Sequence, residues 1–108
     1  MAFKRTLAPT FKTEVTVMVA NDKGGFDKNT FTGEFKRPTS DEAKSLRPLG
    51  NEDVARRQLV GWEMRDDETK ELVPFTEDAK EWLLSISPAP MAVALAFLEA
   101  VNGARSKN

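Results

Sequence analysis

The alternation of apolar and polar residues from Phe11 to Ala20 is the feature that most constrains the fold. Every second position there is apolar or β-branched, at Phe11, Thr13, Val15, Val17 and Val19. This period of two predicts a strand with one buried face. The alternation returns in residues 29–37, after the turn-forming segment 21–25. We therefore expect an antiparallel β-hairpin over residues 11–37, and its apolar face must pack on the rest of the chain because isolated hairpins are marginally stable.

The region after the hairpin is expected to be helical. Thr39 and Glu42 have the spacing of a capping box, which predicts a short helix that ends before Pro48. Asn51 is the expected N-cap of a second helix, whose apolar residues continue at helical spacing to Trp62.

Two further helices complete the prediction. Thr76 is the expected N-cap of a helix whose apolar stripe reaches Ile86. Pro88 and Pro90 open the last helix, which runs over residues 91–101 and has Gly103 in the C-cap position.

The last helix is apolar on nearly every side. A helix with this composition is either central in a core or half of an interface, and the pattern leaves both alternatives open. A chain of 108 residues has little room to surround a helix completely.

These elements predict a single α+β domain over residues 1–108, with a hairpin followed by three to four short helices. We divide it into a flexible N-terminus (1–10), the β-hairpin (11–37) and a helical part (39–104). The closing residues are also expected to be mobile.

Composition argues against catalysis. The chain has no Cys, His or Tyr, so thiolate nucleophiles, histidine bases and the usual zinc, haem and iron–sulfur ligands are missing. We expect no enzyme activity, cofactor or metal site. The acidic residues Asp66, Asp67, Glu68 and Glu71 are interpreted as a solvated loop rather than a cation site.

The longest apolar stretch, 88–98, is too short to span a bilayer, so cytoplasmic residence is expected.

The hairpin region is basic and carries interleaved phenylalanines. Residues 1–40 have a net charge of +3, residues 41–82 have −5, and the whole chain has −1. A β-ribbon that binds nucleic acid has this character, and it remains an alternative. Packing of the hairpin uses the same face, so Phe11, Phe26, Phe31 and Phe35 are predicted to be core residues.

The two tryptophans, Trp62 and Trp82, follow helical apolar positions. They are predicted to anchor two packed helices in the core. A position at the rim of an interface is the alternative, because large aromatic side chains dominate binding hot spots.

Several segments, in order, resemble a known family. They are the opening 1–5, the turn 21–28, the strand 31–37, Leu59-Val60-Gly61-Trp62, Val73-Pro74-Phe75-Thr76 and the closing 103–108. Together they resemble the tail assembly chaperones of long-tailed bacteriophages and prophages. The resemblance covers nearly the whole chain.

The resemblance implies a role in virion morphogenesis. Members of the family bind the tape measure protein, keep it soluble, and help the tail tube protein polymerise around it in the host bacterial cytoplasm. Many are made in two forms by a ribosomal frameshift. No membrane partner is implied, and nucleic acid is not the expected partner. Another structural or adaptor protein of a phage tail is an alternative.

A chaperone of this kind needs an adaptable apolar surface, which methionine and alanine provide in helix-against-helix contact. We hypothesise that the last helix, supported by the one before it, binds the client. The predicted partner-binding residues are Trp82, Leu83, Ile86, Met91, Ala92, Leu95, Ala96 and Leu98. Assembly into a homo-oligomer through the same surface is equally compatible with the sequence.

Overall fold

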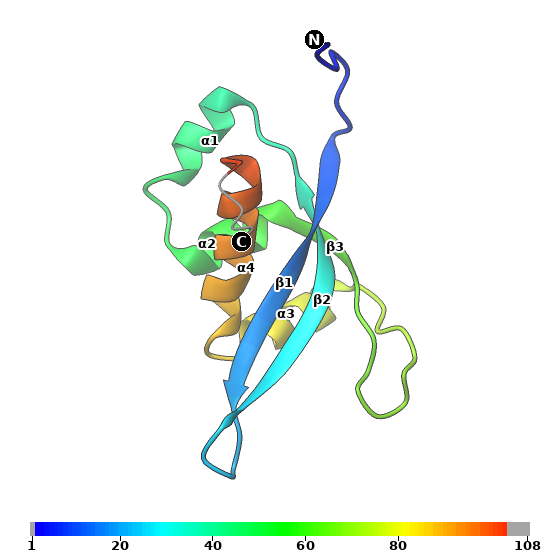
Figure 1. Cartoon of the computed structure of the whole chain (residues 1–108). Coiled ribbons are helices and arrows are strands. Elements are labelled where there is room, and N and C mark those ends of the chain that lie inside the picture. The colour runs from blue at the N-terminus through cyan, green and yellow to red at the C-terminus, as the bar shows by residue number, and fades with distance from the viewer. Residues whose placement is uncertain (1, 104–108) are drawn as a thin grey trace.

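A computed structural model describes residues 2–103, and within them the chain forms three strands and four helices (Figure 1). The elements in order are β1 (Thr10–Ala20), β2 (Phe26–Lys36), α1 (Ser40–Leu46), α2 (Asn51–Gln58), β3 (Leu59–Glu63), α3 (Glu77–Leu84) and α4 (Ala89–Val101). The predicted α+β class, with an N-terminal hairpin and a series of short helices, is confirmed. Met1 and the closing segment 104–108, for which mobility was predicted, lie outside the described residues.

β1 and β2 form the predicted antiparallel hairpin. Val15 lies opposite Phe31 and Phe11 lies opposite Phe35, so the apolar positions of both strands share one face. At the turn, the side-chain oxygen of Asn21 accepts hydrogen bonds from the backbone of Lys23 and Gly25 at 3.0 Å each. Gly24 has a φ of +87°, which explains glycine at that position.

Two of the three side-chain caps predicted for the helices are present. Thr39 and Glu42 form the predicted capping box, and the Thr76 hydroxyl accepts from the amide of Ala79 at 3.0 Å. The prediction for α2 is wrong by one residue, because Gly50 is the N-cap and Asn51 is already helical. No side chain caps this end, and the carbonyl of Gly50 accepts the first helical hydrogen bond, from Val54.

The prediction that α2 continues to Trp62 is also wrong. The helix ends at Gln58, and Leu59–Glu63 form β3, antiparallel to β2 in a sheet of order β1-β2-β3. The free edge of β2 offers backbone partners that outweigh helical propensity here. The Gln58 side chain donates to the carbonyl oxygen of Lys36 at 3.2 Å, which joins the end of α2 to the end of β2.

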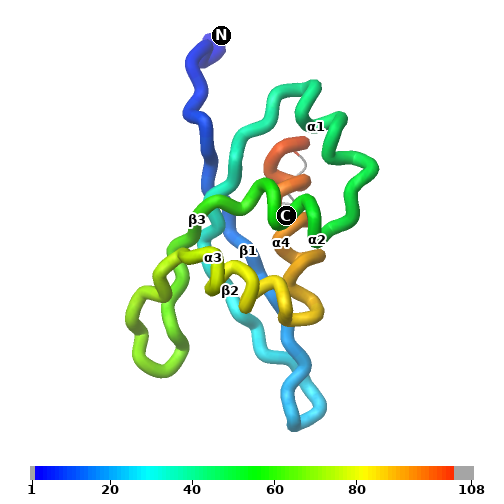
Figure 2. The backbone as a smooth tube through the Cα atoms, turned by 180° about the vertical axis from the view of Figure 1, so that it is seen from behind, coloured from blue at the N-terminus to red at the C-terminus, as the bar shows by residue number. Residues whose placement is uncertain are grey.

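The core lies between the sheet and α4. Phe97 from α4 lies with its ring centroid 6.0 Å from Phe11 and 5.6 Å from Phe35. Ala94 is fully buried in a helix that packs on α2 as well as on β1. Seen from behind, α3 crosses the sheet near the lower end of α4 (Figure 2). Gly103 has a φ of +67°, as predicted for a residue that ends the last helix.

Candidate partner-binding site

α4 has one buried face and one exposed face. Ala89, Val93, Ala94 and Phe97 are at most 1% exposed and belong to the core. Met91, Leu95 and Leu98 are 62%, 51% and 37% exposed. Their spacing of four and three residues places them on one side of the helix, and we call this row of side chains the α4 strip. Thus α4 is neither wholly internal nor wholly external.

The two alanines predicted to bind a partner lie at the margin of this exposed face. Ala92 and Ala96 are half-buried and pack against the core. Glu99 is the only charged residue of α4, so the exposed face of the helix is almost entirely apolar.

α3 contributes to a different surface. Trp82 is 52% exposed, Ile86 just beyond the helix is half-buried, and Leu83 is 4% exposed. Leu83 therefore belongs mainly to the core, and it can add little area to a partner-binding surface. The prediction that Trp82 is a core anchor is wrong, because the residue is exposed, and its position at the rim of an interface stays a prediction.

Trp82, Leu83 and Ile86 line a groove of about 660 Å³ between α3, the hairpin and the loop after β3. This volume lies in the range of sites that hold ligands. The apolar lining of this groove, which we call the α3–hairpin groove, consists of Val17, Val19, Phe31, Met64, Val73, Trp82, Leu83 and Ile86. None of its lining residues comes from α4, so the predicted residues divide between two separate surfaces.

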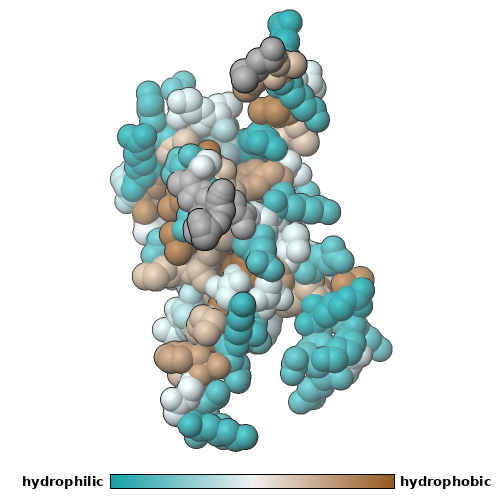
Figure 3. Space-filling model, in the orientation of Figure 1, coloured by the Kyte–Doolittle hydropathy of each residue, from teal (hydrophilic) through white to brown (hydrophobic). Residues whose placement is uncertain are grey.

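The charges at the groove come from the loop and the hairpin. Asp66, Asp67 and Arg65 line it from the loop, and Lys28 lines it from β2. The Asp66 carboxylate accepts from the amides of Thr69 (3.0 Å) and Glu68 (2.8 Å), which holds its pKa below the usual range. The loop is exposed, as predicted, and its hydrophilic side chains project from the body in Figure 3.

One ion pair and two hydrogen bonds from Lys80 hold α3 against α2 and the start of β3. The Arg56 guanidinium donates to both carboxylate oxygens of Glu81, at 2.9 and 2.5 Å, and also to Glu52. On the inner side, Lys80 reaches the carbonyl oxygens of Arg56 and Leu59. With Lys80 held inward, the Trp82 side chain two positions later lies on the outer side of α3.

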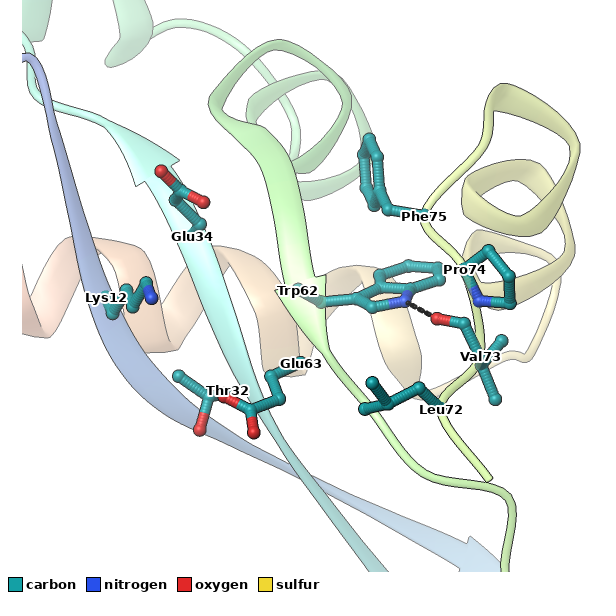
Figure 4. A pocket seen from close by; sticks show the side chains of 9 residues that line it. All are labelled: Lys12, Thr32, Glu34, Trp62, Glu63, Leu72, Val73, Pro74 and Phe75. Atoms are coloured by element: carbon teal, nitrogen blue, oxygen red, sulfur yellow. Dashed lines mark hydrogen bonds between the residues drawn. The ribbon is translucent and has the colours of Figure 1, made fainter. Parts of the chain in front are cut away.

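A smaller cavity of about 310 Å³ lies at the β3 edge of the sheet (Figure 4). The Trp62 indole donates to the carbonyl oxygen of Val73 at 2.8 Å, and Phe75 packs edge-to-face on the same ring at 4.8 Å. These contacts attach the segment before α3 to β3. Trp62 is thus a half-buried strand residue and not the helix anchor that the sequence predicted.

Three of the four phenylalanines of the basic hairpin lie in or against the core, as predicted. Phe31 and Phe35 are buried and Phe11 packs on the core, but Phe26 beside the turn is 65% exposed. Phe26 was therefore wrongly assigned to the core. It lies at the tip of the hairpin, where neither a helix nor β3 extends far enough to cover it.

Within residues 2–103, no group of three or more His, Cys, Asp or Glu side chains could hold a metal ion. In the same part of the chain no single helix is long and apolar enough to cross a membrane. α3 and α4 reach that length and apolar character only together, with a bend of 103° between them.

The helical periodicity of the last helix predicted the residues of the α4 strip. It did not show that the α3 residues belong to a different surface, the α3–hairpin groove. Sequence reasoning missed the hairpin wall of the groove, since Val17 and Val19 were assigned to packing alone. No protein-family model, curated protein or solved structure matches this chain.

Proposed function

We propose that this protein is a tail assembly chaperone of a long-tailed bacteriophage or prophage. In this role it binds the tape measure protein, keeps it soluble while the tail tube protein assembles, and performs no catalysis. It acts in the cytoplasm of the bacterial host. The resemblance of several segments to that family suggests the role, and the exposed α4 strip supports it.

The observation that carries the proposal is that α4 has one buried face and one exposed apolar face. Phe97 and its neighbours hold the helix firmly on the sheet, while Met91, Leu95 and Leu98 remain exposed on the opposite side. A rigid helix with an apolar row at i, i+4 and i+7 is suited to receive the apolar face of another helix. Met91 adds an adaptable contact, as a surface that meets many sites along a long client requires.

The size of the strip favours weak binding by each copy. The exposed fractions of Met91, Leu95 and Leu98 add up to about one and a half side chains. Burial of this area against a partner would contribute roughly 2–4 kcal/mol to the binding free energy. Micromolar affinity requires about 8 kcal/mol. One copy would therefore hold its client loosely, and many copies along one client would hold it together through avidity. Such binding is compatible with release during tail assembly.

The decisive experiment is co-expression with the tape measure protein of the same phage, with the soluble fraction of the client as the readout. Leu95→Asp should remove the solubilising effect, because a carboxylate cannot be buried against an apolar helix without a large penalty. Leu72→Asp is the matched control, since Leu72 is 55% exposed but lies in the loop region and not on α4. Circular dichroism would establish that both variants are folded.

The proposal fails if folded Leu95→Asp solubilises the client as well as the unmodified chain does. Mass spectrometry of purified virions tests the adaptor alternative, since a chaperone is absent from finished particles and an adaptor is present. Binding through the basic hairpin to nucleic acid would weaken steeply with salt, whereas binding through the strip would persist.

A further inference from the structure

The N-terminal arm, residues 2–9, exposes two large apolar side chains. Phe3 is 82% exposed and Leu7 is 49% exposed. The arm is held at its base, where Arg37 donates to the carbonyl oxygens of Ala8 (2.8 Å) and Pro9 (2.9 Å). In Figure 1 it projects from the end of β1 opposite the hairpin turn.

The α3–hairpin groove is complementary to this arm in polarity. Its lining carries aromatic and aliphatic side chains, and the exposed Trp82 forms part of the rim. A phenylalanine side chain that leaves water and packs against an indole gains both apolar burial and a ring contact. The groove therefore offers what Phe3 lacks in the isolated chain.

Charge also matches on the loop side of the groove. The arm carries Lys4 and Arg5 and no acidic residue. The loop presents Asp66 and Asp67 at the groove, and its segment 65–71 carries four acids against two bases, a net charge of −2. Lys70 of this segment lies 3.8 Å from Asp67, and Lys28 lines the groove from the hairpin side. Arg65 donates to the carbonyl of Lys70, which directs its guanidinium to the loop backbone. A basic occupant is therefore favoured along this wall.

The arm is too short to reach the hairpin wall in its own chain. Phe3 precedes Pro9 by six residues, a span of at most about 20 Å. Val17 lies seven residues beyond Thr10, about 23 Å along the strand. The chain would also need to reverse direction at Pro9. Phe3 can therefore meet Val17 and Val19 only in another copy.

We propose that the N-terminal arm of one copy docks in the α3–hairpin groove of a second copy, with Phe3 against Trp82 and the Lys4-Arg5 pair facing Asp66 and Asp67. The contact is heterologous, so it produces head-to-tail chains unless a ring closes. It leaves the α4 strip of every copy free, and it does not depend on the proposed chaperone role.

The first test is the concentration dependence of the mass of the full chain, measured by sedimentation velocity. Phe3→Asp should weaken self-association about tenfold or more, because the burial of one aromatic side chain is lost. Phe26→Asp is the matched control, since Phe26 is 65% exposed but does not line the groove. Its self-association should equal that of the unmodified chain.

A charge exchange tests the direction of the contact. A chain with Lys4→Glu and Arg5→Glu, and a second with Asp67→Lys, should each self-associate less than the unmodified chain. Mixed together, the reversed arm of the first should bind the reversed loop of the second. The proposal is overturned if the mixture does not associate, if Phe3→Asp associates normally, or if Leu95→Asp abolishes association while Phe3→Asp does not.

Discussion

The ammonium group of Lys80 lies 3.0 Å from the carbonyl oxygen of Leu59 and 2.6 Å from that of Arg56. Lys80 is only 8% exposed, and its Nζ lies 6.0 Å from the ring centroid of Phe75. Both carbonyls belong to the end of α2 and the start of β3, where helical partners are missing. A buried lysine of α3 therefore stabilises the transition from helix to strand.

Replacement of this lysine should destabilise the fold. Lys80→Met keeps the apolar stem but removes both hydrogen bonds, so we expect the free energy of unfolding to fall by about 1–3 kcal/mol. Urea denaturation would measure the change. Lys44→Met, at an exposed position of α1, should change stability by less than about 0.5 kcal/mol. Equal stability of Lys80→Met and the unmodified chain would contradict this role of Lys80.

The end of α2 also shows why sequence reasoning failed there. Val54, Ala55, Leu59 and Trp62 fit a helical period, yet the last two lie on β3. The switch depends on the free edge of β2 and on Lys80, which is more than twenty residues away in sequence. The hairpin and the Thr39 and Thr76 caps were predictable because each depends on residues close together along the chain.

The candidate site was predictable only as far as it depends on residues that are close together along the chain. An apolar pattern around α4 indicated an excess of apolar surface, but it could not say which face is covered. Phe97 decides this, because its ring packs on Phe11 and Phe35 of the sheet. Trp82 is a large apolar residue of the kind expected in a core, but α3 buries Lys80, Leu83 and Leu84 and leaves Trp82 exposed.

Gly33 should be intolerant of a side chain. A Cβ atom there would lie 2.9 Å from Cε2 of Phe35 and 3.2 Å from Cγ2 of Val15, both in the core. Alanine favours a strand over glycine, but the clash dominates, and Gly33→Ala should cost about 1–3 kcal/mol. Thermal denaturation would test this. Gly25→Ala is the control, because its Cβ meets only Asn21 at 3.8 Å.

The contact between Arg56 and Glu81 should make stability depend on pH. The hydrogen bonds from the guanidinium hold the pKa of Glu81 below its usual value of 4.5. A carboxyl group with a lowered pKa in the folded state stabilises the protein at neutral pH, and this contribution is lost as the pH falls through the folded pKa. We expect Glu81→Gln to be less stable at pH 7, with a difference that shrinks in acid.

Denaturant titrations from pH 7 to pH 3 would follow this difference. Glu14→Gln, on the exposed face of β1, provides the comparison because Glu14 belongs to none of the ion pairs found within residues 2–103. If Glu81→Gln and Glu14→Gln showed the same pH dependence of stability, the ionic contact would not contribute in solution.

The two faces of α4 should respond differently to truncation. Leu95 is 51% exposed, so Leu95→Ala should cost about 1 kcal/mol or less. Phe97 is 1% exposed between two aromatic rings, and Phe97→Ala should cost about 3–5 kcal/mol. Urea denaturation of the purified chain measures both. If Leu95→Ala were as destabilising as Phe97→Ala, the α4 strip would be covered within the isolated chain, and the surface assigned to the client would not exist. A small effect at Leu95 instead means that any loss of client binding in Leu95→Asp reports on the contact and not on the fold.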